Sequence, residues 1–217
     1  MNTIELINAL LSNPVTKGSF IGVYALDLLP KHKLRKPCSL IANLDRSNQP
    51  GSHWISIFLP KRGPFEFFDS FATKGLECTP HFREFFHLNG HNEKIDCCNE
   101  AGNSIKTSHK QVQGDFSEIC GQYSCLFLYF RCKKKSFKDF LNIFSNDRLE
   151  LNDTYAIKLF TKIFKDKKKK REKKKMRKKN TVQDGGCSTS SSSFTTSILF
   201  KKNKNCIQNC KSRLKPL

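Results

Sequence analysis

The chain is organised around one stretch, Gln113-Gly114-Asp115-Phe116-Ser117-Glu118-Ile119-Cys120-Gly121-Gln122-Tyr123. Its first part is polar, and its last part leads into an apolar run. In that run the apolar side chains recur at helical spacing and occupy both faces: Tyr123, Cys125, Leu126, Phe127, Leu128 and Phe130. Since a helix that is apolar nearly all round has to be buried, the pattern predicts a central core helix that begins at Cys120.

The position of Cys120 predicts a reactive thiol. The first residues of a helix carry unpaired backbone N–H groups and the positive end of the helix dipole, and both favour a thiolate over a thiol. Gly121 leaves the thiol unshielded. Gln113 lies seven residues earlier, far enough for a loop to return its amide toward the sulfur. An amide donor placed there would suit an oxyanion hole.

An upstream β-hairpin supplies two further polar groups. The alternating run from Trp54 to Leu59 predicts a strand, a Pro- and Gly-containing turn follows, and a second strand over 65–68 ends at Asp69. The outer ends of an antiparallel hairpin meet, so we expect His53 and Asp69 to lie side by side. The chain therefore offers an imidazole, a carboxylate, an amide and a thiol.

These four groups are the set that thiol-dependent peptide hydrolysis requires. Cys120 would attack the carbonyl carbon, His53 would hold and transfer the proton, and Asp69 would orient the imidazole. Gln113, together with the backbone N–H of Cys120, would stabilise the oxyanion. A lone Cys at a helix start is more often a small buried hydrophobe, but no single packing role accounts for all four positions.

The same residues carry a family resemblance. His53-Trp54 at a strand start, Asp69 after the next strand, and Gln113-Gly114 before Cys120-Gly121 resemble the adenovirus protease (adenain) family. Its relatives include the proteases of Polinton/Maverick elements and the SUMO and ubiquitin-like deconjugating proteases. The resemblance covers roughly residues 4–164. One position departs from the adenoviral pattern: Asp69 stands where those enzymes carry Glu, whereas the deconjugating branch uses Asp.

The resemblance implies an α+β fold with a small central mixed or antiparallel sheet flanked by helices. It also implies a cysteine endopeptidase with the catalytic residues His53, Asp69, Cys120 and Gln113. Trp54 and Gly121 would then line the substrate site and favour glycine beside the cleaved bond, although Trp54 is equally suited to plain core packing. The expected substrates are viral or transposon capsid precursors. The alternatives are ubiquitin-like conjugates, and a catalytically inactive basic protein that binds nucleic acid.

Charge divides the chain into a protease domain over 1–164, a Lys/Arg-rich segment over 165–180 and a low-complexity tail over 181–217 that we expect to be disordered. Residues 1–164 carry 21 basic and 16 acidic side chains, whereas 165–217 carry 18 basic and 3 acidic ones. The basic run fits a solvated segment, a nuclear-localisation signal or a non-specific DNA contact. The predicted location is the host nucleus or the virion, with the cytoplasm as the alternative.

The resemblance adds two candidate activators, DNA and a peptide that forms a disulfide just before the Gln113 loop. Cys97 and Cys98 are the nearest cysteines, but neither falls at the matching position. The chemistry itself demands no metal or organic cofactor. We expect a monomer.

The 10 cysteines do not indicate a secreted disulfide scaffold, because no signal peptide opens the chain and no stretch approaches 18 apolar residues. We therefore predict free thiols in a reducing compartment, without secretion, membrane insertion or a metal site.

Three of the predicted flanking helices have readable boundaries. Asn2 with Glu5 forms a capping box for a first helix, with Ile4, Ile7, Leu10 and Leu11 on its inner face. A second helix spans 80–88 with three phenylalanines inward. The last helix is predicted to begin at a cap on Asn152 or Asp153 and to pack through Ala156, Leu159, Phe160, Ile163 and Phe164.

Overall fold

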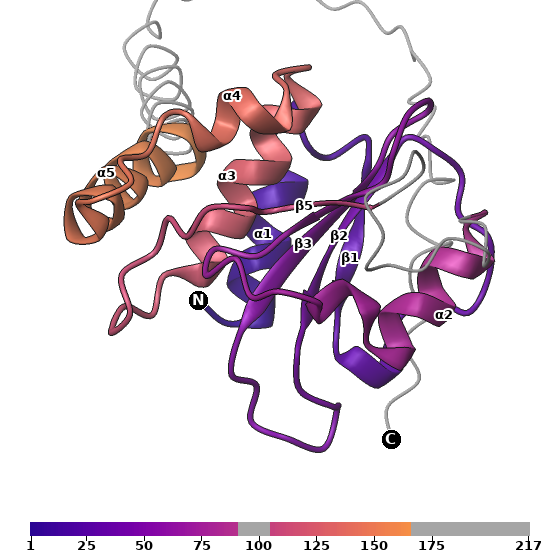
Figure 1. Cartoon of the computed structure of the whole chain (residues 1–217). Helices are drawn as coiled ribbons and strands as arrows, with labels where there is room; N and C mark the ends of the chain where they lie inside the picture. The colour runs from indigo at the N-terminus through magenta and orange to yellow at the C-terminus, as the bar shows by residue number, and fades with distance from the viewer. Residues whose placement is uncertain (91–104, 166–217) are drawn as a thin grey trace, which may run out of the picture. The chain divides into compact units, whose positions relative to one another are not determined.

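The computed structural model describes residues 1–90 and 105–165, which fall within a unit that runs from Met1 to Met176 (Figure 1). The remaining residues, 91–104 and 166–217, lie outside this description. The expectations for Cys97 and Cys98 and for the basic segment and tail therefore concern residues outside the described part of the chain.

A five-stranded mixed sheet forms the centre, with its strands in the spatial order β1-β2-β3-β4-β5. The strands are β1 (Phe20–Tyr24), β2 (Cys38–Asn43), β3 (Trp54–Leu59), β4 (Glu66–Phe68) and β5 (Lys106–Thr107). The two inner pairings, β2 with β3 and β3 with β4, are antiparallel, and the two outer pairings are parallel. The predicted hairpin is confirmed, and of the two predicted sheet types, mixed or antiparallel, the structure has the mixed one.

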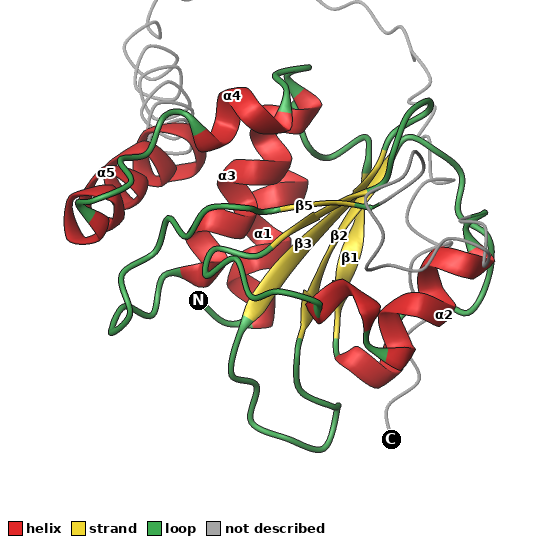
Figure 2. Cartoon of the chain, viewed as in Figure 1, coloured by secondary structure: helices red, strands yellow, loops and turns green. Residues whose placement is uncertain are grey.

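Helices cover both faces of this sheet (Figure 2). The helices are α1 (Thr3–Ser12), α2 (Pro80–Leu88), α3 (Cys120–Cys132), α4 (Phe137–Leu141) and α5 (Leu149–Phe160). Short helical turns lie at Leu26–Leu28, Leu76–Cys78 and Thr161–Lys165. Residues of α1, α3, α4 and α5 share one hydrophobic cluster with Ile41, Phe58 and Phe68, whereas α2 shares a second cluster with Leu40, Ile57 and Phe67. Because neighbouring strand residues point to opposite faces, the sheet separates two cores. The α+β architecture is confirmed.

Helix α3 is the centre of the larger core, as its pattern predicts. Its side chains are buried from Tyr123 through Leu128. The ring of Phe127 stacks on Phe68 with a centroid separation of 4.9 Å, and it also contacts Phe137 at 4.8 Å and Phe140 at 5.5 Å. This aromatic cluster joins the sheet, α3 and α4.

The inner face of α1 differs from the prediction. The capping box of Asn2 and Glu5 is present and Leu10 is buried as predicted, but Leu6 is buried as well, whereas Ile4 and Leu11 are 69% and 49% exposed. The helix has apolar residues on two adjacent stripes. Tertiary packing selects the stripe that contains Leu6, because this residue lies over Gly121 of α3.

The predicted cap of the last helix is wrong. Helix α5 begins at Leu149, so Asn152 and Asp153 lie inside it and are buried. Neither side chain caps the helix, since both bind other segments of the chain. The predicted inward residues Ala156, Phe160, Ile163 and Phe164 are buried, and Leu159 is partly buried.

Within the described residues, none of the helices combines the length and the apolar character that crossing a membrane requires.

The aromatic cluster leads to a stability prediction. Phe127→Ala should lower the free energy of unfolding by about 3–5 kcal/mol, because it leaves a cavity among three rings. Urea denaturation followed by circular dichroism measures this value. Phe116→Ala is the matched control, since Phe116 is 103% exposed and its removal should change stability by less than about 0.5 kcal/mol. Equal effects of the two substitutions would contradict the assignment of the core.

Candidate active site

The β3–β4 hairpin brings His53 and Asp69 together. The Nε2 atom of His53 lies 2.7 Å from Oδ1 of Asp69, and both residues are buried. Ser56 pairs with Phe68 in the antiparallel register, which leaves the two residues at the adjoining ends of their strands. The predicted side-by-side placement is confirmed.

A tight turn after β4 holds the Asp69 carboxylate. It accepts hydrogen bonds from the backbone N–H groups of Phe71 at 3.0 Å and Thr73 at 2.9 Å, in addition to the contact with His53. The Asp69 backbone N–H in turn donates to Oγ of Ser108 at 2.8 Å. Burial alone would raise the pKa of Asp69, but these hydrogen bonds outweigh it and lower the pKa. The carboxylate is therefore charged and fixed in orientation.

The thiol of Cys120 stands at the first residue of α3, as predicted, and is 8% exposed. Burial raises the pKa of this thiol. A hydrogen bond with His53 and hydrogen bonds from the backbone N–H groups of Trp54 and Gly121 lower the pKa by more than burial raises it, so the net shift is downward. The start of α3 therefore favours a thiolate.

His53 connects the thiol to the carboxylate. Burial lowers the pKa of His53, but the hydrogen bonds to Asp69 and Cys120 reverse this effect and raise the pKa to about 9. Because Nε2 faces Asp69, Nδ1 is the ring nitrogen left to face the sulfur. The arrangement favours an imidazolium between a thiolate and a carboxylate, with the raised His53 pKa and the lowered Cys120 pKa supporting the same ion pair.

Two reciprocal hydrogen bonds fix the start of α3 against β3. The hydroxyl of Ser56 donates to the Ser124 carbonyl at 3.1 Å, and the hydroxyl of Ser124 donates to the Trp54 carbonyl at 3.2 Å. Both serines are fully buried. These bonds set the position of α3 along β3, and with it the approach of Cys120 to His53.

Trp54 and Gly121 have visible packing roles beside the site. A Cβ atom on Gly121 would lie 3.1 Å from Cβ of Met1, 3.2 Å from Cδ2 of Leu6 and 3.5 Å from Cδ1 of Trp54. The indole N–H of Trp54 donates to the Met1 carbonyl at 3.0 Å. Gly121 is thus needed for the close approach of α1 to α3. Substrate contact by Trp54 or Gly121 stays a prediction.

Gln113 is buried, and its side-chain amide is oriented from both ends. Its Oε1 accepts a hydrogen bond from the Ser70 hydroxyl at 2.7 Å, and its Nε2 donates to the Ser117 carbonyl, which folds the loop back on itself. Among the described residues, no further hydrogen bond uses Nε2, and Gln113 is 1% exposed. No hydrogen bond joins Gln113 to Cys120 in the described part of the chain, and the oxyanion role of Gln113 is a proposal.

Ser70 is a residue that the sequence interpretation missed. Besides its hydroxyl contact with Gln113, its carbonyl accepts the backbone N–H groups of Val112 at 2.9 Å and Gln113 at 3.2 Å. It directly follows Asp69. The dipeptide Asp69-Ser70 therefore supplies the carboxylate that binds His53 and also binds the Gln113 loop. A hydroxyl next to a candidate acid is the only signal of this role in the sequence.

The first turn of α5 holds the other side of the Gln113 loop. The Asp153 carboxylate accepts the Gly114 backbone N–H at 3.2 Å and lies 2.9 Å from the Tyr123 hydroxyl. Asn152 donates to the Val112 carbonyl at 3.2 Å. These contacts explain why two polar residues are buried inside α5, and they show the physical reason for the wrong cap prediction.

The described residues contain no group of three or more His, Cys, Asp or Glu side chains placed to hold a metal ion.

Comparisons with known proteins find similarity only among solved structures. No protein-family model matches the chain, and no curated protein matches it. The crystal structure of the ASFV pS273R protease matches with 18% identity and a TM-score of 0.48, covering 76% of this chain and 67% of that one. A selenomethionine crystal structure of the same protease matches with 22% identity and a TM-score of 0.36, covering 61% and 46%. The central domain of an uncharacterized Lpg1148 protein from Legionella pneumophila matches with 11% identity and a TM-score of 0.37, covering 66% and 88%.

Thiol labelling tests the ion pair. At pH 6, iodoacetamide should modify Cys120 well before Cys38, Cys125 and Cys132, because burial raises the pKa of those three thiols while the pKa of Cys120 is lowered. Peptide mapping by mass spectrometry identifies the modified residue.

The variant Asp69→Asn should slow this labelling. Without the carboxylate the pKa of His53 falls, so the imidazolium loses its proton at a lower pH than in the wild type. The pKa of Cys120 then rises toward its ordinary value of 9.0. Asp147→Asn, at an exposed position, is the control and should leave labelling unchanged. Labelling of Cys120 no faster than that of Cys38 would disprove the ion pair.

Proposed function

We propose that this protein is a cysteine peptidase in which Cys120, His53 and Asp69 form the catalytic triad. The observation that carries this proposal is the continuous contact from a thiol at a helix start, through a buried imidazole, to a carboxylate 2.7 Å away. A purely structural cysteine does not need a partner that lowers its pKa in this way.

The geometry supports a two-step reaction. The Cys120 thiolate attacks the scissile carbonyl carbon and forms a C–S bond, and the His53 imidazolium donates its proton to the amine nitrogen as the C–N bond breaks. A thioester remains. Water then attacks the thioester carbonyl and neutral His53 accepts one proton from this water. The C–S bond breaks to release the thiolate and a carboxylic acid, which loses its remaining proton to solvent. Asp69 stays ionised throughout and keeps the imidazole oriented.

Gln113 would supply the oxyanion donor, together with the backbone N–H of Cys120. Support for this role comes from the orientation of the amide: Ser70 binds its oxygen, so its nitrogen faces the loop that leads to Cys120. A preorganised donor stabilises the developing negative charge without reorganisation. Loss of one such donor typically costs about 10²–10³ in kcat.

We place the enzyme in the adenain-type branch of cysteine peptidases and propose glycine-containing sites in viral or transposon capsid precursors as its substrates. The motif residues His53-Trp54, Gln113-Gly114 and Cys120-Gly121 support this branch. Asp69 favours the alternative, a deconjugating peptidase that acts on ubiquitin-like proteins. The two differ in what they need from the substrate, because the first should cut short peptides and the second should require the folded partner.

The test of the proposed function uses the full chain with a library of short peptides and with ubiquitin-like fusion proteins. Mass spectrometry should identify new termini in the wild-type digest, with glycine enriched beside the cleaved bond. Cys120→Ala should abolish these termini, and His53→Ala should slow their formation by about 10²–10⁴, the usual contribution of a general acid–base. The cleavage rate of the wild-type protein should rise with pH as Cys120 ionises, and it should fall again as His53 loses its proton near pH 9.

Each reaction is run with and without double-stranded DNA at low salt, because the basic run over 165–179 is the proposed DNA contact. Acceleration by DNA would support the proposed activator. Cleavage that persists undiminished in Cys120→Ala, or no cleavage of either substrate class in any condition, would refute a Cys120-dependent peptidase.

Ser70 should act as a positioning residue for Gln113. We expect Ser70→Ala to lower kcat by about 2–12-fold with little change in KM, since one hydrogen bond contributes about 0.5–1.5 kcal/mol. Ser70→Thr should restore most of the rate because it keeps the hydroxyl. The deciding measurement is the double variant: in a Gln113→Ala background, Ser70→Ala should cause no further loss. Additive losses would show that Ser70 acts through general stability instead.

A further inference from the structure

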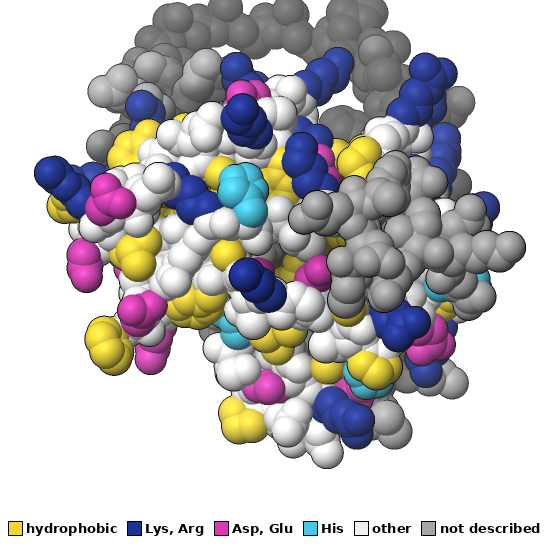
Figure 3. Space-filling view, in the orientation of Figure 1, with side chains coloured by type: hydrophobic (Ala, Val, Ile, Leu, Met, Phe, Trp, Pro, Cys, Tyr) yellow, Lys and Arg dark blue, Asp and Glu magenta, His cyan; other side chains and the backbone are white. Residues whose placement is uncertain are grey.

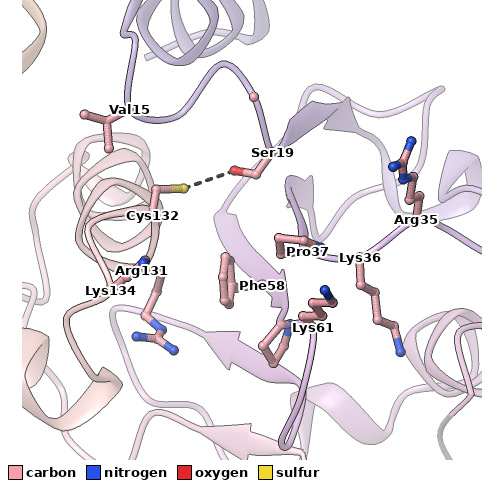
Figure 4. A pocket seen from close by; sticks show the side chains of 12 residues that line it. Val15, Ser19, Arg35, Lys36, Pro37, Phe58, Lys61, Arg131, Cys132 and Lys134 are labelled. Atoms are coloured by element: carbon pink, nitrogen blue, oxygen red, sulfur yellow. Dashed lines mark hydrogen bonds between the residues drawn. The ribbon is translucent and has the colours of Figure 1, made fainter.

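A second concave site lies at the far end of α3 from Cys120. It is an open hollow of about 850 Å³, lined by residues from the turns between α1 and β1, the loop before β2, the end of β3 with the turn after it, and the end of α3 (Figure 4). Cys120 and Cys132 are the first and last residues of α3, so the two sites are about 18 Å apart along the helix. The second site is therefore separate from the candidate active site.

Five positively charged side chains line this hollow, which we name the cationic pocket: Arg35, Lys36, Lys61, Arg131 and Lys134. No Asp or Glu is among the lining residues in the described part of the chain. Lys and Arg side chains also lie along the upper edge of the face in Figure 3. A concave wall of one charge sign concentrates its field and attracts ions of the opposite sign.

The five charged side chains differ in how many ion pairs and hydrogen bonds they already make within the protein. Arg131 pairs with Glu66 through two nitrogens, and its guanidinium lies 5.1 Å from the centre of the Phe58 ring. Lys36 donates to the Asn89 carbonyl at 2.8 Å and is turned away from Phe58 (Figure 4). Glu66 neutralises one of the five positive charges, so four remain. Within residues 1–90 and 105–165, no ion pair neutralises Arg35, Lys61 or Lys134.

Apolar groups line the same hollow. Val15, Pro37, Phe58 and Pro60 lie between the cations, and Figure 4 shows Lys61 and Arg131 on either side of the Phe58 ring. A phosphate-rich ligand would favour free Arg forks and polar backbone groups. Here one of the two arginines is already bound to Glu66, and the wall between the charges is apolar. Unpaired cations with apolar groups between them suit a peptide that carries both carboxylates and an apolar side chain.

We propose that the cationic pocket binds an acidic peptide segment that carries an apolar side chain. The carboxylates would pair with Lys61, Lys134 and Arg35, and the apolar side chain would lie against Val15, Pro37 and Phe58. This binding does not rest on the proposed peptidase activity, because it involves the opposite end of α3.

Fluorescence anisotropy with labelled 12-residue peptides tests the proposal in the full chain carrying Cys120→Ala, which prevents cleavage. The first peptide combines Asp and Glu with two Phe residues. The second keeps the charge but replaces Phe by Ser, and the third keeps Phe but replaces Asp and Glu by Asn and Gln. We expect the first to bind at least tenfold more tightly than either of the others, and its affinity to fall with added salt.

Charge-reversal variants locate the binding. Lys61→Glu with Lys134→Glu should weaken binding of the first peptide at least tenfold, and Val15→Ser should weaken the first peptide but not the second. The control pair Lys138→Glu with Lys158→Glu changes the net charge equally at exposed positions outside the pocket. Because both variant pairs keep the basic run over 165–179, any binding of acidic peptides to that run contributes equally to the two measurements.

Three results would overturn the proposal. The first is equal affinity of the two acidic peptides, which would indicate charge attraction alone. The second is an equal loss of affinity in the pocket and control variants. The third is pocket-dependent binding of inorganic polyphosphate without pocket-dependent binding of the peptide, which would assign the site to phosphate ligands.

Discussion

The contact between the first turn of α3 and the start of β3 is the constraint on which the candidate site depends. Cys120 and His53 come from different elements, and neither element alone fixes their approach. The reciprocal Ser56 and Ser124 hydrogen bonds set the position of the helix along the strand. Gly121 then allows α1 to close over the helix start, since any side chain there would meet Met1 and Leu6. A shift of this junction would separate the thiol from the imidazole without unfolding the core.

Burial gives this junction its electrostatic character. Desolvation by itself would neutralise all three groups, because it raises the pKa of Cys120 and Asp69 and lowers that of His53. Their mutual hydrogen bonds reverse each of these shifts. A buried charge without a partner costs several kcal/mol, so the three groups are stable in their ionised forms only together. The same interdependence makes the arrangement specific, since a substitution at one position changes the charge state of the other two.

The loop that carries Gln113 is held from two directions by buried polar groups. Ser70 binds it from the end of β4, and Asn152 and Asp153 bind it from α5. Backbone groups in an irregular buried loop need such partners, because an unpaired buried N–H or carbonyl costs about 1–3 kcal/mol. The helices of the larger core therefore have a second role beyond packing. They fix the geometry of the segment that leads into Cys120.

The sequence by itself determined the elements and the identity of the reactive groups. Periodicity located α3 and its buried surface, alternation located the hairpin, and hairpin geometry predicted the contact between His53 and Asp69, because these depend on local spacing. Tertiary structure alone decided which stripe of α1 is buried, why Asn152 and Asp153 lie inside α5, and that Ser70 holds Gln113. Each of these depends on which distant segment arrives next to the residue, and a side chain's partner across 40 or more residues leaves no periodic trace in the chain. The cationic pocket has the same origin, since its charges come from three separate segments that only the folded sheet and α3 bring together.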